Sequence, residues 1–372
     1  MKMTLFQLMS FALSALILPL EAQAVLSTTT LRQGEPAFLL FFNNTPRRFQ
    51  VEPSILYSIR QALTQTGSPM GVWRPAAGAW QQTGFKARVS YANGGSNPVS
   101  TGFPLPVDPG TMLGKYWDYV SIDGMDQTLH ARWDLATSAV LFLLGVPVDA
   151  PAGEASIIVT GPDGREAARL ETSIAGRGFR RDDIHLDEAL TSLRVDQDPL
   201  KVEQARRYLA LLGTINDDAV FMDRGFMRPV AGERRTSLFG DIRKFIYADE
   251  GTAWGTHNGI DYGYPTGTPV WSAGRGRVAM AEDRIVTGNT VVIEHLPGVY
   301  TIYMHLHHMA VRVGDMVERK QAIGTIGATG LATGPHLHWE LRVSGVACDP
   351  EALAGLDKMP RIRTMTAAIE GR

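Results

Sequence analysis

Turn-forming residues recur about every eight to twelve positions between Phe226 and Leu353, with short strand-like runs between them. The candidate strands are residues 291–294, 300–306, 311–317 and 337–343. This spacing predicts an all-β domain over residues 223–353, and it constrains the fold more than any other feature of the chain.

Histidines are concentrated in this part of the chain, where seven of the nine lie within residues 257–339. They form three short motifs, which are His257-Asn-Gly-Ile-Asp261, Tyr303-Met-His-Leu306 and His336-Leu-His-Trp339. Alternate residues of a strand share a face, so we expect His336, His338 and Glu340 to point the same way. The two imidazoles would then stand roughly 6.5 to 7 Å apart.

The preceding candidate strand carries a third histidine of interest. By the same arithmetic, Tyr303, His305 and His307 share one face of that strand. If the two strands are neighbours in one sheet, His305 stands beside the His336 and His338 pair.

His257 and Asp261 need a bend between them, because four residues of extended chain would separate them by about 13 Å. Gly259 gives the backbone the freedom to make that bend. Histidine and aspartate together suit Zn²⁺, and three protein ligands with an open position are typical of a catalytic site. Spacing alone leaves open whether His336 or His338 completes the set. Single histidines are more often surface or core residues, so the argument depends on all three motifs occurring together.

Residues 226–352 resemble the LytM-type peptidase domain of the M23 zinc metallopeptidases. The motifs that carry the resemblance include Ser237-Leu-Phe-Gly240 with Arg243, the three histidine motifs, Gly288-Asn-Thr-Val-Val-Ile293 and Val313-Gly-Asp-Met-Val317. The resemblance implies one Zn²⁺ per chain, held by His257, Asp261 and His338. It also implies that His305 and His336 are unligated catalytic histidines.

The substrates implied by the resemblance are peptide cross-links or stem peptides of bacterial peptidoglycan. The chain has no His-Glu-x-x-His motif, so histidine would replace the glutamate base of other zinc proteases. We expect His307 and His308 to be bystanders. Glu340, next along the same face, is a candidate to orient a histidine. Arg243 would either contact a substrate carboxylate or pair with an acid.

Residues 1–24 have the composition of a signal peptide, with Lys2, a long apolar run and the cleavage sequence Ala22-Gln-Ala24. We therefore expect an exported protein of the periplasm or cell envelope, with no transmembrane segment after cleavage. A retained anchor is the alternative.

The net charge of −2 predicts no nucleic-acid partner. A single cysteine, Cys348, excludes an internal disulfide.

The chain of 372 residues predicts a mainly β, multidomain protein. We expect an N-terminal β-rich domain at 25–114, with a short helix at 54–63, and a small β-sandwich-like domain at 115–182. A helical linker follows at 183–222, with a helix from Asp198 to Gly213. We expect one face of this helix to pack against a domain, namely the face formed by Val202, Ala205, Tyr208, Leu209 and Leu212. The tail 354–372 ends in four residues that match a recombinant protease site and are equally compatible with a native end.

Upstream modules would position the catalytic domain or cover its groove, with an upstream Asp, Glu or Asn filling the open zinc position. Two other functions compete with the peptidoglycan endopeptidase. One is a non-catalytic murein-binding or amidase-activating protein, which the five intact site positions argue against. The other is a zinc protease for elastin-like or other glycine-rich proteins. A biotinyl or lipoyl carrier, suggested by residues 311–324, is excluded because the chain lacks a suitable lysine in a tight turn.

Overall fold

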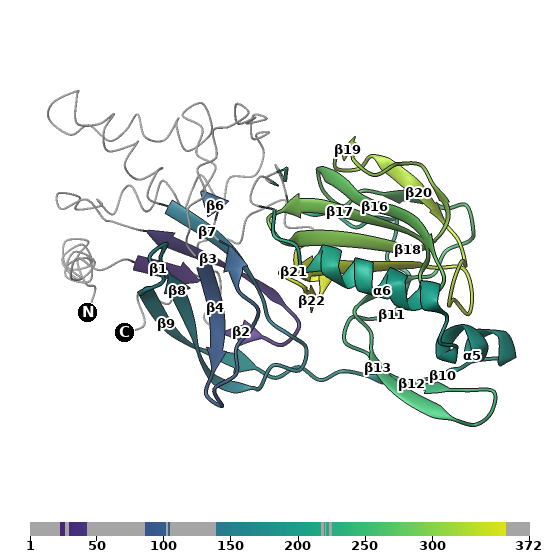
Figure 1. Ribbon diagram of the computed structural model, residues 1–372, viewed down its shortest axis with the longest axis horizontal. Coiled ribbons are helices and arrows are strands. Elements are labelled where there is room, and N and C mark those ends of the chain that lie inside the picture. The colour runs from purple at the N-terminus through teal and green to yellow at the C-terminus, as the bar shows by residue number, and fades with distance from the viewer. Residues whose placement is uncertain are drawn as a thin grey trace, which may run out of the picture.

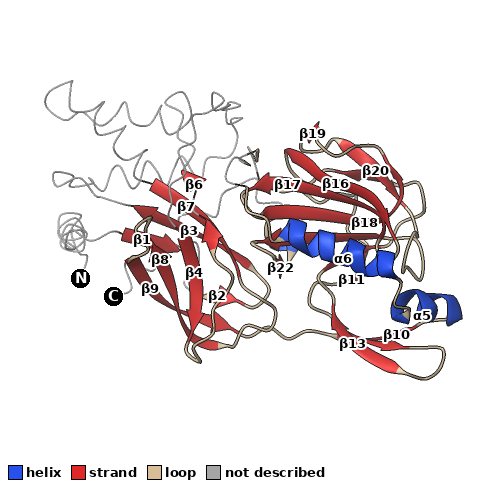
Figure 2. Cartoon of the chain, in the orientation of Figure 1, coloured by secondary structure: helices blue, strands red, loops and turns tan. Residues whose placement is uncertain are grey.

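The computed structural model describes residues 23–26, 30–42, 86–101, 103–104, 139–216, 219, 221–222 and 225–354. These residues form a mainly β protein with an N-terminal two-sheet unit and a larger C-terminal unit (Figures 1 and 2). Most of the signal peptide, the expected helix at 54–63 and the tail after residue 354 lie outside the described residues. Within the described part of the chain, no helix is long and apolar enough to cross a membrane.

The N-terminal unit is a sandwich of two sheets, ordered β1-β3-β7-β6 and β2-β9-β8-β4-β5. Its strands are β1 (Gln23–Leu26), β2 (Leu31–Arg32), β3 (Pro36–Phe42), β4 (Lys86–Tyr91), β5 (Ser100–Thr101), β6 (Phe103–Pro104), β7 (Ala139–Gly145), β8 (Gly153–Thr160) and β9 (Glu166–Ala175). β8 and β9 form the expected hairpin around the turn at 161–164, where Gly164 has a φ of 78°.

The described strands do not divide near residue 114, where we expected one β module to end and another to begin. β3 pairs antiparallel with β7, and β4 pairs antiparallel with β8. One hydrophobic core joins both ranges, from Leu39 and Val89 to Phe142 and Ile157. The apolar faces of these strands are covered only when strands from before and after residue 114 pack together. The described residues of β1 to β9 therefore form one sandwich.

The C-terminal unit is built on a large sheet with the main order β11-β14-β21-β18-β17-β16-β19. Its strands are β11 (Arg235–Ser237), β12 (Ile242–Ile246), β13 (Thr252–Thr256), β14 (Gly259–Tyr262), β15 (Pro269–Trp271), β16 (Gly276–Arg284), β17 (Gly288–Leu296), β18 (Val299–Met309), β19 (Met316–Val317), β20 (Ala322–Ile326), β21 (Leu337–Val343) and β22 (Val346–Cys348), followed by the 3₁₀ helix η1 (Pro350–Ala352). The sequence therefore predicts this sheet well. Within the candidate strand 311–317, however, only Met316–Val317 is a strand, because the chain turns at Gly314 with a φ of 93°.

The segment expected to be a helical linker begins with a strand, β10 (Arg181–His185), followed by α5 (Glu188–Val195) and α6 (Pro199–Leu212). β10 pairs in parallel with β12, and β12 pairs with β13 to complete a separate three-stranded sheet. α6 lies across the large sheet (Figure 1). The segment is therefore part of the C-terminal unit.

α6 begins and ends where the sequence predicts, with Asp198 as N-cap and Gly213 as C-cap. The predicted buried face is confirmed for Tyr208 and Leu212 and wrong for Val202 and Leu209, which are 55% and 64% exposed. The buried residues of the helix are Gln204, Tyr208 and Leu212, which follow one another at intervals of one turn.

The two units share part of their hydrophobic core. Leu143 of β7 belongs to the main core of the C-terminal unit, and Val148 packs against it. Close packing continues at Gly34, where an added Cβ would lie 2.4 Å from the Phe239 ring. Arg177 donates to Asp349 at 2.8 Å across the same boundary. The sandwich is therefore packed firmly against the C-terminal unit.

Candidate metal centre

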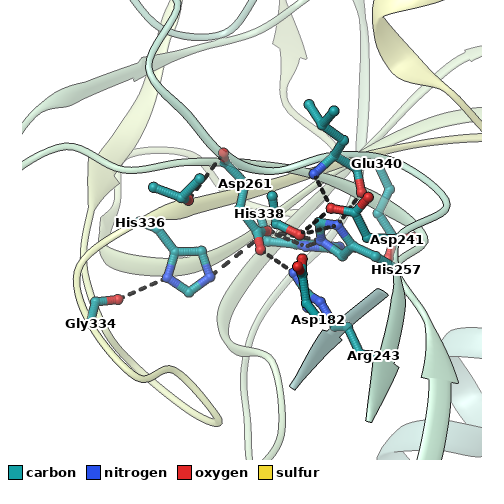
Figure 3. A network of polar contacts seen from close by, with 12 residues as sticks. Asp182, Asp241, Arg243, His257, Asp261, Gly334, His336, His338 and Glu340 are labelled. Carbon is teal, nitrogen blue, oxygen red and sulfur yellow. Dashed lines mark hydrogen bonds and ion pairs between the residues drawn. The ribbon is translucent and has the colours of Figure 1, made fainter. Parts of the chain in front are cut away.

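Three side chains from two adjacent strands and the loop before them meet at one point (Figure 3). His257 precedes β14, Asp261 lies on β14, and His338 lies on β21 directly opposite Asp261. His257 Nε2 is 3.0 Å from Asp261 Oδ1 and 2.9 Å from His338 Nδ1, and His338 Nδ1 is 2.8 Å from Asp261 Oδ1. All three residues are buried. Gly259 is the first residue of β14 and has no positive φ, so its glycine is explained by close strand packing and not by the predicted bend: an added Cβ there would lie 2.4 Å from the Trp339 carbonyl oxygen.

Each candidate ligand is oriented by a partner on its far side. His257 Nδ1 donates to the Leu238 carbonyl at 2.7 Å, so its Nε2 carries a free lone pair. His338 Nε2 donates to Glu340 at 2.9 Å, which leaves Nδ1 for the centre. Two nitrogens and one carboxylate oxygen within 3.0 Å of one another form a donor set that suits Zn²⁺.

Asp261 has its second oxygen occupied by Arg243, whose Nη2 donates to Oδ2 at 2.5 Å. This contact resolves the two expectations for Arg243 in favour of pairing with an acid. The contact holds Oδ1 toward the two histidines, so Arg243 orients a candidate ligand.

The charges at the centre favour a bound cation. Burial works against charge on His338, but hydrogen bonds to Asp261 and Glu340 outweigh it and raise the pKa of His338 to about 9. Burial opposes the charge of Asp261 as well, yet the bonds from His257 and His338 hold the pKa of this carboxyl well below its usual range. Burial lowers the pKa of His257. A cation placed between the three atoms would take the place of the proton on His338.

A fourth imidazole reaches the centre through an unusual backbone conformation. His305 lies on β18 with a φ of 61°, in the left-handed region that few residues other than glycine adopt. Tyr303 packs in the main core, whereas Met304, which lies opposite His338, packs in the cluster beneath α6. Regular alternation would return His305 to the core side. The left-handed conformation keeps His305 on the metal side and lets Leu306 enter the core instead.

The prediction that Tyr303 and His305 share a face is therefore wrong, although His305 still stands beside the other histidines as expected. The ring centroids of His305 and His336 are 4.8 Å apart, and those of His305 and His338 are 6.2 Å apart. His336 lies just before β21, where it bridges to Gly327, and its Nε2 is 3.9 Å from Asp261 Oδ1.

Neighbouring backbone carbonyls determine which ring nitrogen of His305 and of His336 carries the proton. His305 Nδ1 donates to the Thr329 carbonyl and His336 Nδ1 donates to the Gly334 carbonyl, each at 2.8 Å. Both rings therefore carry a free Nε2 lone pair. Burial, reinforced by the nearby His336, lowers the pKa of His305 to about 3, so this imidazole is a neutral acceptor at ordinary pH.

A groove of about 710 Å³ opens over the centre. Part of its lining comes from the loop between Leu331 and His336. Asp182 and Ile184 of β10 and Leu190 of α5 also line it. The described residues of the sandwich do not line it. The linker segment therefore forms part of the groove.

Sequence reasoning missed Asp241, a buried carboxylate behind His257 (Figure 3). It accepts hydrogen bonds from Ser237 Oγ at 3.0 Å, Leu238 N at 2.8 Å and Arg180 Nη2 at 2.6 Å. Its carbonyl also accepts from the backbone N–H of His257 at 2.9 Å. Asp241 thus fixes the turn that orients His257. Its place within the Ser237–Arg243 motif was the available signal.

The remaining histidines of the dense stretch lie away from the centre. His307 and His308 are exposed, as expected of bystanders. His295 is fully buried, with Nδ1 donating to the Arg275 carbonyl and Nε2 2.7 Å from Thr301 Oγ1. Its role is in the core.

Comparison with known proteins adds independent information about this domain. Residues 255–350 match the family model described as peptidase family M23. Peptidoglycan DD-endopeptidase ShyC of Vibrio cholerae is 40% identical over 146 residues, which are 39% of this chain and 32% of that protein. ShyA, a peptidoglycan DD-endopeptidase of the same organism, is 42% identical over 125 residues, which are 33% of this chain and 29% of that protein.

Among solved structures, the catalytic domain of the prophage-encoded M23 protein EnpA from Enterococcus faecalis is 30% identical, with a TM-score of 0.29. The similarity covers 34% of this chain and 95% of that structure.

The chain spans about a third of the length of the curated relatives ShyC and ShyA.

Proposed function

Because the chain belongs to peptidase family M23 through its domain at residues 255–350, we propose that it is an exported zinc endopeptidase of the bacterial cell envelope. Its substrates would be peptide cross-links or stem peptides of peptidoglycan. The observation that carries the proposal is the meeting of His257, Asp261 and His338 beside two histidines with free Nε2 atoms. The names of the most similar relatives support the choice of substrate.

In this proposal His257 Nε2, Asp261 Oδ1 and His338 Nδ1 hold one Zn²⁺. When bound, zinc supplies Lewis acidity that activates water and polarises the scissile carbonyl. His305, kept neutral by burial, accepts a proton at Nε2. His336 lies closer to solvent at the groove and, when protonated at Nε2, would stabilise the oxyanion or donate that proton to the leaving amine. The carbonyls of Thr329 and Gly334 hold the other ring proton on Nδ1 of both histidines, so each Nε2 is the atom that accepts and gives up a proton.

Occlusion of the groove by upstream residues remains part of the proposal in a narrower form. Upstream residues of β10 and α5 line the groove. Among them, Asp182 of β10 is paired directly with Arg243 of β12. If Asp182 restricts access, Asp182→Ala should digest purified sacculi faster than the mature chain.

The test of the main proposal incubates purified sacculi with the mature protein and identifies released muropeptides by mass. We expect His305→Ala and His336→Ala to retain stoichiometric zinc and to lose about 10² to 10⁴ in rate. His257→Ala and Asp261→Ala should lose both zinc and activity. His308→Ala, an exposed histidine, is the matched control and should behave as wild type.

Stoichiometric zinc in purified Asp261→Ala would contradict the ligand assignment. Binding of sacculi without any released muropeptide would favour the non-catalytic murein-binding role. Cleavage of elastin-like peptides with intact sacculi would favour the third class of function.

A further inference from the structure

α6 lies outside the family-matched region and yet is fixed to the catalytic sheet by buried polar contacts. The Gln204 side chain donates to the Asp283 carbonyl at 3.3 Å and accepts from Ile285 N at 2.9 Å. Arg284 donates to the Gln204 carbonyl at 3.2 Å. A helix that only connected two domains would not need these contacts, which set its position along the end of β16.

Tyr208, one turn after Gln204, is held from both sides. The Arg284 guanidinium lies over its ring, 4.3 Å from the centroid. Its ring packs with Leu212, Ile302 and Met304 in the cluster between α6 and the sheet. Burial raises the pKa of Tyr208, so its hydroxyl keeps its proton and acts as a donor.

The Tyr208 hydroxyl points to Glu340, the carboxylate that orients His338. Glu340 is 4% exposed, and its Oε1 accepts from His338 Nε2 at 2.9 Å. Its Oε2 accepts from Arg342 Nε at 2.8 Å and from the Tyr208 hydroxyl at 3.4 Å. A buried carboxylate is held most firmly when each of its lone pairs accepts a hydrogen bond, because an unpaired polar group costs free energy in a low dielectric.

We propose that Tyr208 is a positioning residue for the metal centre: it holds Glu340 in the orientation that directs His338 Nδ1 toward the metal. This deepens the proposed function and rests on it in taking His338 as a zinc ligand. α6 then completes the hydrogen-bond chain from the helix through Glu340 to the metal ligand.

The experiment measures zinc affinity of the full mature chain by competition with a chromogenic chelator. Tyr208→Phe keeps the ring and removes one hydrogen bond to a charged acceptor, so we expect affinity to fall about three- to tenfold. Glu340→Gln should lower it about ten- to a hundredfold. In the Glu340→Gln background, Tyr208→Phe should change affinity less than twofold, because the group it acts through has already been altered.

Tyr300→Phe is the matched control, because the Tyr300 hydroxyl belongs to the same cluster and donates to the Thr214 carbonyl at 2.9 Å, just beyond α6. It should lower the unfolding temperature of the zinc-free chain and leave zinc affinity unchanged. The same pattern of loss in both tyrosine variants would mean that the helix acts only through stability, which would overturn the proposal.

Wild-type zinc affinity in Tyr208→Phe would also overturn the positioning role, and so would equal losses in the two Glu340 backgrounds. In either case a wild-type chain that binds zinc and digests sacculi keeps the proposed function intact. A wild-type chain that binds no zinc would refute the proposed function, and the positioning role would fall with it.

Discussion

Acidification should reveal how strongly the fold depends on a neutral His295. This histidine is fully buried, and its ring lies edge-on to Phe226 with a centroid distance of 4.8 Å. Burial lowers its pKa from 6.5 to about 4, and the Arg275 carbonyl that accepts from Nδ1 offsets only part of this effect. The folded protein therefore holds His295 neutral under conditions in which the unfolded chain would charge it.

The size of the effect follows from the two pKa values. The folded-state pKa is depressed, so the stability is fully present above pH 6.5, falls as the pH drops and levels off below about pH 4. Each pKa unit corresponds to about 1.4 kcal/mol, so the interval between the two values amounts to about 3 kcal/mol.

Urea unfolding of the chain and of its His295→Gln variant between pH 7 and pH 4 measures the contribution of His295 to the free energy of unfolding. Glutamine does not titrate, so it lacks the pH-dependent loss whatever its own cost in packing. We expect wild type to lose about 3 kcal/mol relative to the variant over that range. Parallel pH profiles would refute the reasoning, since they would mean that His295 has an ordinary pKa in the folded state.

Two further predictions concern the supports of the candidate metal centre. Gly288→Ala should lower the proposed peptidoglycan hydrolysis at least tenfold with zinc retained, because the added Cβ would lie 2.5 Å from the Thr329 carbonyl oxygen, which orients the His305 imidazole. Gly267→Ala has a similar backbone cost of about 1 kcal/mol without any atom within 4 Å, and full loss of activity there would contradict a steric cause. Arg180→Gln removes the cation from buried Asp241 and should lower the unfolding free energy by about 1 to 2 kcal/mol, a value reduced because the arginine is 55% exposed. Unchanged urea unfolding and zinc affinity in that variant would show that the pair supports nothing.

The sequence predicts the large C-terminal sheet because strand alternation and turn spacing are local properties. It places His338 and Glu340 on one face correctly, since β21 is a regular strand. It fails at His305, because alternation assumes extended backbone and nothing local announces a φ of 61°. The functional site is thus where the local rule breaks, as expected of strained positions.

Upstream of the sheet, local patterns fail for a different reason. The apolar side chains of α6 suggested that Val202 and Leu209 were buried, whereas the helix buries Gln204. A polar residue can be buried there only because the turn after β16 offers it a carbonyl and an N–H, which no pattern within the helix can indicate. Pairing of β3 with β7 likewise depends on partners far away in the sequence.

The presence of Leu143 in the main core affects how the C-terminal unit could be cut from this chain or transplanted into another. A fragment that starts after the sandwich would expose to water the apolar surface that Leu143 covers. Loss of the burial of one leucine side chain costs about 1.5 to 3 kcal/mol. The C-terminal unit is therefore not structurally independent of the sandwich. Recombination that exchanged the sandwich would have to supply an apolar side chain at the position of Leu143.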